Sequence, residues 1–287
     1  MENNAELRDF LRTRRARLSV DDVDIGGTAR ARRVPGLRRE EVAQLAGVSV
    51  DYYSRLEQGR HLNVSDEVLD AVARALRLDD TERTYLFRIA KTNPRRPRRR
   101  APAPVQRVRP GVRRILEMLD QVTPAFVFGR RMDVLAANKL ARALFTDFDA
   151  LPSRERNLLR YTFLDDTTRE LFVDWEDVAR DNVGTLRLDA GRHPDDPLLM
   201  ELVGELSVKS PEFRRWWADH NVRERTHGTK RYHHPLVGAV TVQYESVALL
   251  GDADQTLCLY TAEAGSPSEA ALQLLANWTG DRVSEGR

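Results

Sequence analysis

Residues 38–59 read RREEVAQLAGVSVDYYSRLEQG, two short amphipathic segments separated by a glycine. The apolar residues of VAQLA recur at the spacing of one helix face, and Tyr53 and Leu56, three residues apart, form the apolar face of a second helix. Between the two, Gly47 can adopt a positive φ without steric cost, which a three-residue turn between crossed helices needs. Val48 follows and is expected to fill the gap. The stretch therefore predicts a helix-turn-helix.

The outward face of the second helix carries side chains that can read base edges in a DNA major groove. Arg55 can donate a bidentate pair to guanine, and Asp51 can accept from the amino group of cytosine. Flanking arginines and the capping serine are placed for phosphates and for the start of the helix. The candidate DNA-binding residues are Arg38, Arg39, Ser49, Val50, Asp51, Tyr52, Arg55 and Arg60.

Further helices are expected to surround this motif. A first helix begins near Ala5, the polar segment 21–35 is expected to be a loop, and the motif's helices span 38–46 and 50–58. Two more helices are predicted over 66–77 and 82–90, with Ser49, Ser65 and Thr81 as N-caps. These five helices predict an all-α bundle over residues 1–93.

The charge of the chain is unevenly distributed. Residues 1–109 carry 24 lysines and arginines against 16 acidic residues, and the remainder carries 22 against 28. The first part is therefore at +8 and the second at −6, and a basic half favours a nucleic-acid partner. Helices that are merely well solvated are the alternative explanation of the charge alone.

Composition also limits the class of protein. With 287 residues, of which 41% are hydrophobic, the chain can form two domains. It contains no apolar run of membrane-spanning length and no signal peptide at its start, so we expect a cytoplasmic location and no membrane partner. Its single cysteine, Cys258, excludes intramolecular disulfides and is interpreted as a small core residue.

Residues 94–110 read PRRPRRRAPAPVQRVRP, which combines proline with seven arginines and predicts a stiff, basic linker. Beyond it, residues 111–287 alternate helical and strand-like segments. Helices are expected over 112–119, 139–145, 153–164, 167–190, 197–206, 211–220 and 266–278. Strands are expected on both sides of a turn at 129–131 within 124–135, and over 229–234, 239–250 and 256–262. The pattern predicts an α+β domain, with an antiparallel sheet and a helical insertion.

Residues 5–90, and VPGLRREEVAQLAGVS in particular, resemble the Xre/Cro family of helix-turn-helix regulators and its MmyB-like subgroup. The likeness continues in VRPGVRRILEML, FVFGRRMDVLAAN, SPEFRRWWADHNVRERTHGTKRYHHPLVG and YTAEAGSPSEAALQLL, and so covers nearly the whole chain. Two departures concern Ala137, where the family usually has Trp, and residues 61–64, where it has a Gly/Pro-rich stretch. The resemblance implies a PAS-like ligand-binding domain that holds a fatty acid or a similar small apolar ligand.

The second domain offers candidates for such a pocket, although each is also a plausible core residue. Asn138 can bind a ligand or cap the helix that follows it. Apolar and aromatic residues supply the walls, and polar residues of the second half can orient a head group, with Arg223 favoured for a carboxylate. The candidate ligand-binding residues are Phe126, Phe128, Asn138, Trp216, His220, Arg223, His227, Tyr232, Tyr244 and Tyr260.

Metal and catalytic functions find no support in the sequence. His233 and His234 are adjacent and would point to opposite faces of a strand, and neither a carboxylate nor a cysteine completes a metal site with His227. A phosphate-binding loop and a nucleophile elbow are both missing. We therefore expect no enzyme activity, no metal and no required cofactor.

The leading hypothesis is a regulator that binds double-stranded DNA as a homodimer, at a near-palindromic operator, under the control of the apolar ligand. In the alternative, the second domain serves only dimerisation or protein interaction. In a third hypothesis, the chain is an enzyme with an accessory helix-turn-helix.

Overall fold

The computed structural model describes residues 4–19, 22–23, 36–60, 63–91, 106–252 and 254–284. Its N-terminal part is a bundle of helices around one apolar core, as predicted. The expected loop 21–35 and the expected linker 94–110 lie mostly outside the described residues. The bundle comprises α1 (Ala5–Arg17), α2 (Arg39–Leu45), α3 (Val50–Glu57), α4 (Asp66–Ala75) and α5 (Asp80–Lys91).

Side-chain caps set the helix starts in this bundle. Ser49 and Ser65 accept hydrogen bonds from backbone amides at the starts of α3 and α4, as expected. The predicted cap Thr81 is wrong, because it lies inside α5. Asp79 accepts instead from the Glu82 amide at 2.8 Å, and Glu82 accepts in return from the Asp79 amide at 3.3 Å. This reciprocal pair starts the helix two residues earlier than predicted.

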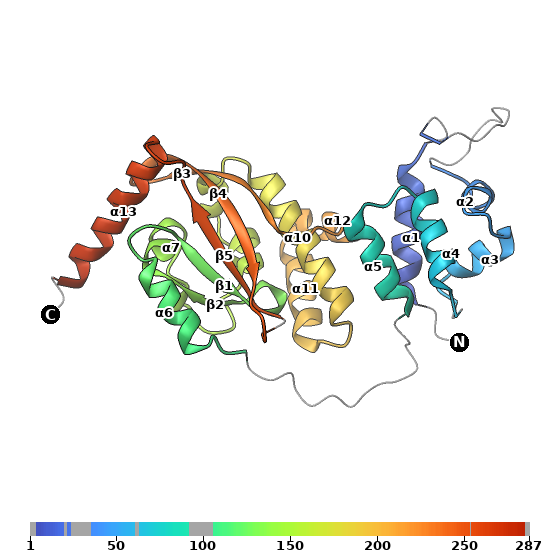
Figure 1. Cartoon of the computed structure of the whole chain (residues 1–287), viewed down its shortest axis with the longest axis horizontal. Helices are drawn as coiled ribbons and strands as arrows, with labels where there is room; N and C mark the ends of the chain where they lie inside the picture. The colour runs from blue at the N-terminus through green and yellow to red at the C-terminus, as the bar shows by residue number, and fades with distance from the viewer. Residues whose placement is uncertain are drawn as a thin grey trace.

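The C-terminal part is built on a five-stranded antiparallel sheet in the order β2-β1-β5-β4-β3 (Figure 1). The predicted α+β class and strand number are confirmed. Consecutive strands are neighbours in three of the four pairs, and the pairing of β1 with β5 joins the first and last strands of the sheet. The strands are β1 (Ala125–Phe128), β2 (Val134–Ala137), β3 (His227–His234), β4 (Gly238–Ala248) and β5 (Thr256–Thr261).

Helices fill the long connection between β2 and β3 and flank the sheet. The expected helix 153–164 begins only at Leu158, where Asn157 caps it. The expected helix 167–190 is two helices, because Phe172 leaves the helical path to form a β-bridge with Tyr232. The helices are α6 (Pro110–Met118), α7 (Lys139–Leu144), α8 (Leu158–Leu164), α9 (Thr167–Leu171), α10 (Trp175–Arg192), α11 (Pro197–Lys209), α12 (Pro211–Ala218) and α13 (Pro267–Ser284), with short 3₁₀ turns η1 (Arg130–Met132) and η2 (Phe148–Ala150).

The two faces of the sheet belong to different apolar clusters. Val112 and Leu116 of α6 pack with Val127 and Leu257 on one face. Val108, near the end of the predicted linker, joins the same cluster, so this part of the linker packs on the second domain. The opposite face, here called the inner face, lies against the inserted helices in the largest apolar cluster.

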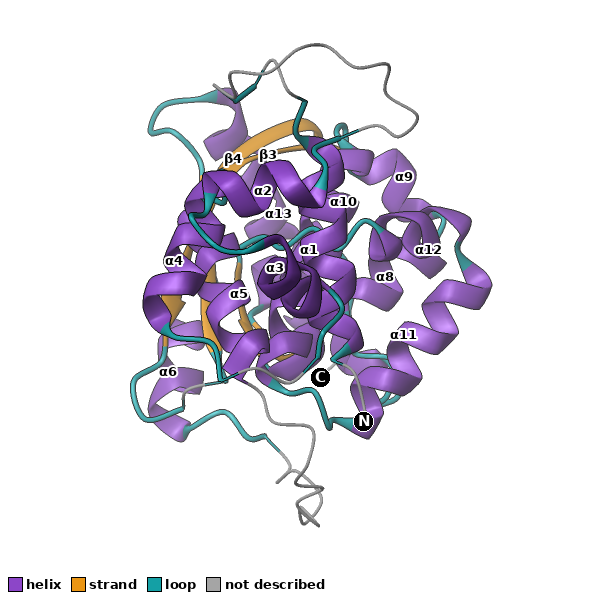
Figure 2. Cartoon of the chain, turned by 90° about the vertical axis from the view of Figure 1, so that its right-hand side faces the viewer, coloured by secondary structure: helices purple, strands orange, loops and turns teal. Residues whose placement is uncertain are grey.

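The bundle rests on the inserted helices, with α1 and α5 beside α10 and α12 (Figure 1). Leu188 of α10 and Val222 join the apolar core of the bundle, so the contact is continuous with that core. Viewed along the long axis from the bundle end, α3 lies in front of the other elements (Figure 2). None of the described helices combines the length and the apolar character that a membrane crossing requires.

Candidate DNA interface and ligand site

Helix α3 presents the predicted outward face at the end of the molecule away from the sheet (Figures 1 and 2). Tyr53 and Leu56 are buried in the bundle, while the Asp51 side chain is 76% exposed and that of Arg55 46%. Val50 is exposed and Tyr52 half-buried. Gly47 has a φ of +66°, the left-handed conformation expected of the turn. The helix therefore offers a polar surface on a fixed apolar base.

The charged residues of this surface differ in how firmly they are held. Asp51 and Arg55 form an exposed ion pair one helical turn apart. Such pairs contribute little free energy, so both side chains are available to a groove. Arg38 and Arg60 are exposed at the two ends of the motif. Ser49 has its hydroxyl oxygen engaged with the Tyr52 amide at 3.1 Å.

Arg39 is tied to a buried carboxylate inside the bundle. Glu57, 1% exposed, accepts from the Nε atoms of Arg15 and Arg39 at 2.7 and 2.8 Å. Burial alone would raise the pKa of Glu57, but the hydrogen bonds and charges of the two guanidiniums lower it. Arg39 thus joins α2 to α3 and α1, and its side chain is still half exposed for a phosphate.

The inner face of the sheet gathers half of the predicted ligand-binding residues into one aromatic cluster. Phe126 contacts Phe128 and Tyr260 with ring centroids 5.4 and 6.0 Å apart, and Tyr244 lies 6.2 Å from Tyr260. Tyr232 joins the cluster through Phe145, whose ring also lies against Phe126. The five predicted residues are buried and Phe145 is partly buried, and the rings lie in contact with one another on this face.

The predicted residues Asn138 and Trp216 have structural surroundings. The Asn138 amide oxygen accepts from the Ala125 and Ala141 amides at 3.0 and 2.9 Å, and its nitrogen donates to the Thr123 carbonyl at 2.8 Å. Asn138 therefore caps α7 and fastens it to β1. Trp216 lies in the helical layer against Trp175.

Three other predicted residues lie outside the aromatic cluster. The Arg223 side chain is 67% exposed and its Nε is 3.6 Å from Asp181. His227 is exposed at the start of β3, with Nδ1 3.2 Å from the Thr226 hydroxyl. His220 lies between the two domains, where its Nδ1 is 3.3 Å from Glu6.

Arg225 contacts the aromatic cluster, although the sequence pattern did not predict it as a site residue. Its guanidinium lies 4.8 Å from the ring centroid of Tyr244 and 5.6 Å from that of Phe128, and it donates to the Tyr260 hydroxyl. Strand alternation continued backwards from β3 would place residue 225 with the exposed His227. Residues 221–226 are irregular, however, so alternation does not apply to them. The one feature of the sequence that could have indicated Arg225 is the excess of basic over acidic residues in residues 221–230, NVRERTHGTK.

A partly exposed carboxylate, that of Glu6, links the two domains. Glu6 of α1 accepts from Arg187 at 2.9 Å and from the Tyr85 hydroxyl, beside His220. Burial would raise the pKa of Glu6, but the hydrogen bond with His220, the charge of Arg187 and the bond from Tyr85 lower it from 4.5 to about 2. The Glu6 carboxylate therefore stays ionised at the contact.

The described residues contain no group of three or more His, Cys, Asp or Glu side chains arranged for a metal ion. The buried Cys258 lies on β5 within the largest apolar cluster.

An exposed helix on a fixed apolar base within a helical bundle is the arrangement of a DNA-binding helix-turn-helix domain, and here it is joined to an α+β domain. In comparisons with family models, residues 6–86 match a helix-turn-helix domain, and residues 108–275 match the MmyB-like transcription regulator ligand binding domain. The second match covers more than half of the chain. The chain therefore belongs to this family, and the two matches confirm the resemblance seen in the sequence. A search of curated proteins finds no match.

Proposed function

We propose that this regulator binds a near-palindromic operator as a homodimer, and that a small apolar ligand of the fatty-acid type in its second domain controls the binding. The observation that carries the DNA-binding part is the exposed surface of α3 on its buried base of Tyr53 and Leu56. One recognition helix reads only a few base pairs, so two copies about one helical turn apart are needed for a specific site.

Exposed apolar side chains support the dimer. Met118 of α6 is 76% exposed and the nearby Val122 67%. Leu274 of α13 is also 62% exposed, so α6 and α13 each carry an exposed apolar side chain. A second copy of the chain is the proposed partner of these helices, because association of like surfaces gives the two-fold symmetry that a palindrome requires.

Replacing Arg55 tests the DNA-binding part. Selection of bound fragments from a random double-stranded DNA library identifies the operator, and native mass spectrometry counts the chains on it. Arg55→Ala is expected to weaken operator binding by about 1–3 kcal/mol and to relax the preference at one position of each half-site, because it removes a base contact.

Arg83→Ala is the matched control. Arg83 is a half-exposed arginine of α5, paired with Asp70 rather than located on the recognition helix. Its replacement is expected to leave the selected sequence unchanged. An unchanged motif in the Arg55→Ala selection, or a single chain on the operator, contradicts the proposal.

The alternative function, a second domain that serves only association, is favoured by one observation. The inner-face rings are in contact with one another, so a ligand must displace rings to enter. A hollow of about 150 Å³ lies on the helical layer instead, lined by Arg180, Val183, Arg215, Trp216, Asp219 and Asn221. Native mass spectrometry of the chain purified from its own host separates the two, because a co-purified apolar molecule supports the ligand.

A further inference from the structure

Asp51 is an acidic residue on a surface that must face a polyanion. Its side chain is 76% exposed in the first turn of α3, two residues after the capping Ser49. Duplex DNA carries one negative charge about every 1.7 Å along its axis, so a carboxylate in the groove is repelled unless a donor engages it. The donor that the structure supplies is the Nη2 atom of Arg55, one helical turn further along. Asp51 therefore meets DNA as half of a neutral pair.

The position of the pair on α3 favours it in two ways. Residues four apart are neighbours on a helix face, and an acid that precedes a base along the helix is the better order. In the first turn, the Asp51 carboxylate also interacts favourably with the helix dipole. Water weakens such a pair in the free protein, but a groove that excludes water strengthens it. The pair is thus expected to persist when α3 is bound to DNA.

The other arginines of the motif have different partners. Arg39 is bound to the buried Glu57. Arg38 and Arg60 are exposed, and within the part of the chain that the structure describes, neither of them forms an ion pair. Contacts to phosphates need charge but carry no sequence information, so exposed arginines without an acidic partner suit them. On the exposed face of α3, by contrast, Arg55 has an acid that restricts its orientation.

The bond to Asp51 changes what Arg55 can contact. A long, flexible arginine in a groove can reach phosphate oxygens as well as base edges. The Asp51 carboxylate occupies an N–H donor of Nη2 and repels phosphates. A guanidinium has further N–H donors on its other nitrogens, which can pair with O6 and N7 of a guanine. The pair therefore favours base contacts by Arg55 over phosphate contacts.

We infer that Asp51 is a positioning residue, whose carboxylate holds the Arg55 guanidinium towards the base edges of the major groove and itself contacts no base. Arg55 then reads one guanine of each half-site. This inference rests on the proposed function, since it takes α3 as the recognition helix. It replaces the direct contact of Asp51 with cytosine that the sequence favoured.

The test compares base preferences of full-length wild type, Asp51→Ala and Asp51→Glu with those of Arg55→Ala. Selection from a random duplex library gives the preference at each position, and titrations at several salt concentrations give the affinity for unrelated DNA. Asp51→Ala is expected to reduce the preference for guanine about 5- to 20-fold at the same base pair that Arg55→Ala affects. Because Arg55 then reaches a phosphate, unrelated DNA should bind about threefold more tightly, with a salt slope steeper by about one.

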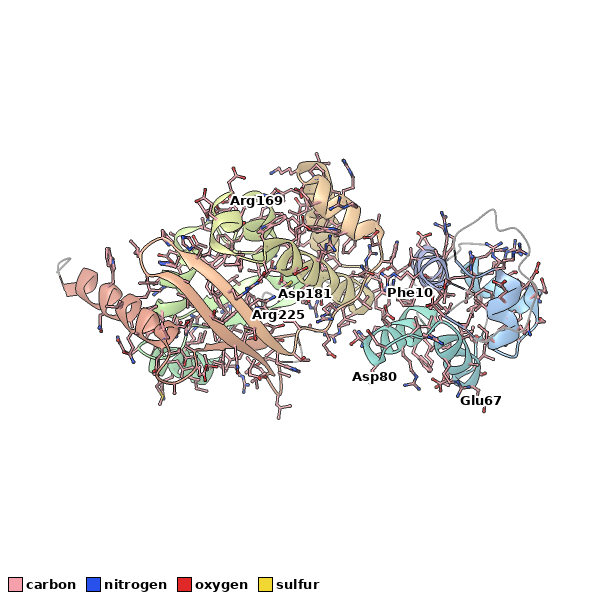
Figure 3. The ribbon with its side chains drawn as sticks, turned by 90° about the horizontal axis from the view of Figure 1, so that it is seen from above. Phe10, Glu67, Asp80, Arg169, Asp181 and Arg225 are labelled. Atoms are coloured by element: carbon pink, nitrogen blue, oxygen red, sulfur yellow. The ribbon has the colours of Figure 1, made fainter. Side chains whose placement is uncertain are left out.

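Two further variants separate positioning from a general effect of charge. Asp51→Glu keeps an acid that can pair with Arg55, so it should restore the guanine preference to within about threefold of the wild type. The control Glu67→Ala removes an exposed acid from the matching position of α4, two residues after the capping Ser65 (Figure 3). It is expected to leave every base preference unchanged, because α4 is not the recognition helix.

The double variant and the remaining outcomes decide between the two roles of Asp51. With Arg55 already replaced by alanine, Asp51→Ala should change no base preference further, because Asp51 acts only through Arg55. If Asp51→Ala instead affects a different base pair from Arg55→Ala, Asp51 reads that base itself, so the inference is wrong while the proposed DNA binding stands. If the wild type selects no sequence at all, the DNA-binding part of the proposed function fails and the inference with it.

Discussion

Gly47 and Gly59 share a backbone conformation but have different surroundings. Both have a φ of +66°, which costs an L-residue free energy. A Cβ atom at Gly47 would meet nothing within 4 Å, whereas one at Gly59 would lie 2.2 Å from the Asn4 carbonyl oxygen. The Asn4 amide also donates to the Gly59 carbonyl at 2.8 Å. Gly59 therefore fixes the end of the recognition helix to the start of α1.

Alanine at the two positions separates conformational strain from crowding. Gly47→Ala is expected to lower the free energy of unfolding by about 1 kcal/mol, from strain alone. Gly59→Ala should cost at least about 1–3 kcal/mol more, because the backbone of Asn4 must move. Urea unfolding followed by circular dichroism measures both. Equal losses would mean that the contact with Asn4 can relax freely.

The positions of some single residues could be predicted from the sequence, and those of others could not. The inward direction of Tyr53 and Leu56 and the exposure of Asp51 and Arg55 were predicted, because helical spacing determines them locally. The position of Arg225 could not be predicted. It depends on an irregular segment whose path is set by the sheet and by α10, and no local period describes such a segment.

Among the elements, α10 is buried against the sheet domain in its first half and against the bundle in its second. Gly191, near its end, lies under Tyr85 of α5, where a Cβ atom would come within 2.4 Å of the ring. Tyr85 is fully buried, packs edge-on against Phe10 and donates to Glu6, so its ring cannot move aside without breaking these contacts. The glycine is therefore required by the contact between the domains rather than by the helix.

Alanine at Gly191 is expected to separate the domains. Alanine stabilises a helix interior by about 1 kcal/mol over glycine, which is the expected gain for Gly204→Ala on α11, where nothing lies within 4 Å of the new Cβ atom. Gly191→Ala should forfeit that gain and increase the radius of gyration in small-angle X-ray scattering. If Gly191→Ala gains as much stability as Gly204→Ala and its radius of gyration is unchanged, the Tyr85 ring can move aside to accommodate the new Cβ atom.

The helix boundaries that the sequence missed have tertiary causes. Leu171, Trp175 and Val178 continue one helical spacing across Phe172, so periodicity alone predicts a single helix over 167–190. The break exists because Phe172 pairs with Tyr232 and the Val173 amide donates to the Arg231 carbonyl. Strand pairing across so many residues leaves no local signature. The five strands themselves were predicted, because their patterns are local: β4 alternates, and β1 is a short apolar run.

For the whole molecule, the contact at Glu6 predicts an acid-sensitive arrangement of the domains. The folded protein lowers the pKa of Glu6 from 4.5 to about 2, so the free energy that the ionised carboxylate contributes is fully present above about pH 4.5 and is lost as the pH falls towards about 2. The partners responsible are Arg187, His220 and Tyr85.

Glu6→Gln isolates this contribution. The variant should be less stable than the wild type at pH 6, and the gap between their free energies of unfolding should close between about pH 4.5 and about pH 2, because a protonated Glu6 resembles glutamine. Urea titrations of both proteins at several pH values measure the gap. A gap that does not depend on pH would place the effect of the substitution elsewhere.

The contact between the bundle and α10 limits how this regulator can be recombined. The contact joins Glu6 and Tyr85 of the first domain to Arg187, Leu188 and Gly191 of the second. A chimera that grafts the DNA-binding bundle onto a different sensor therefore keeps the residues on only one side of this contact. An engineered biosensor that keeps this bundle must therefore carry a cation, an apolar residue and a glycine at the corresponding turns of the helix that replaces α10. Without them, the two modules would be connected only by their linker.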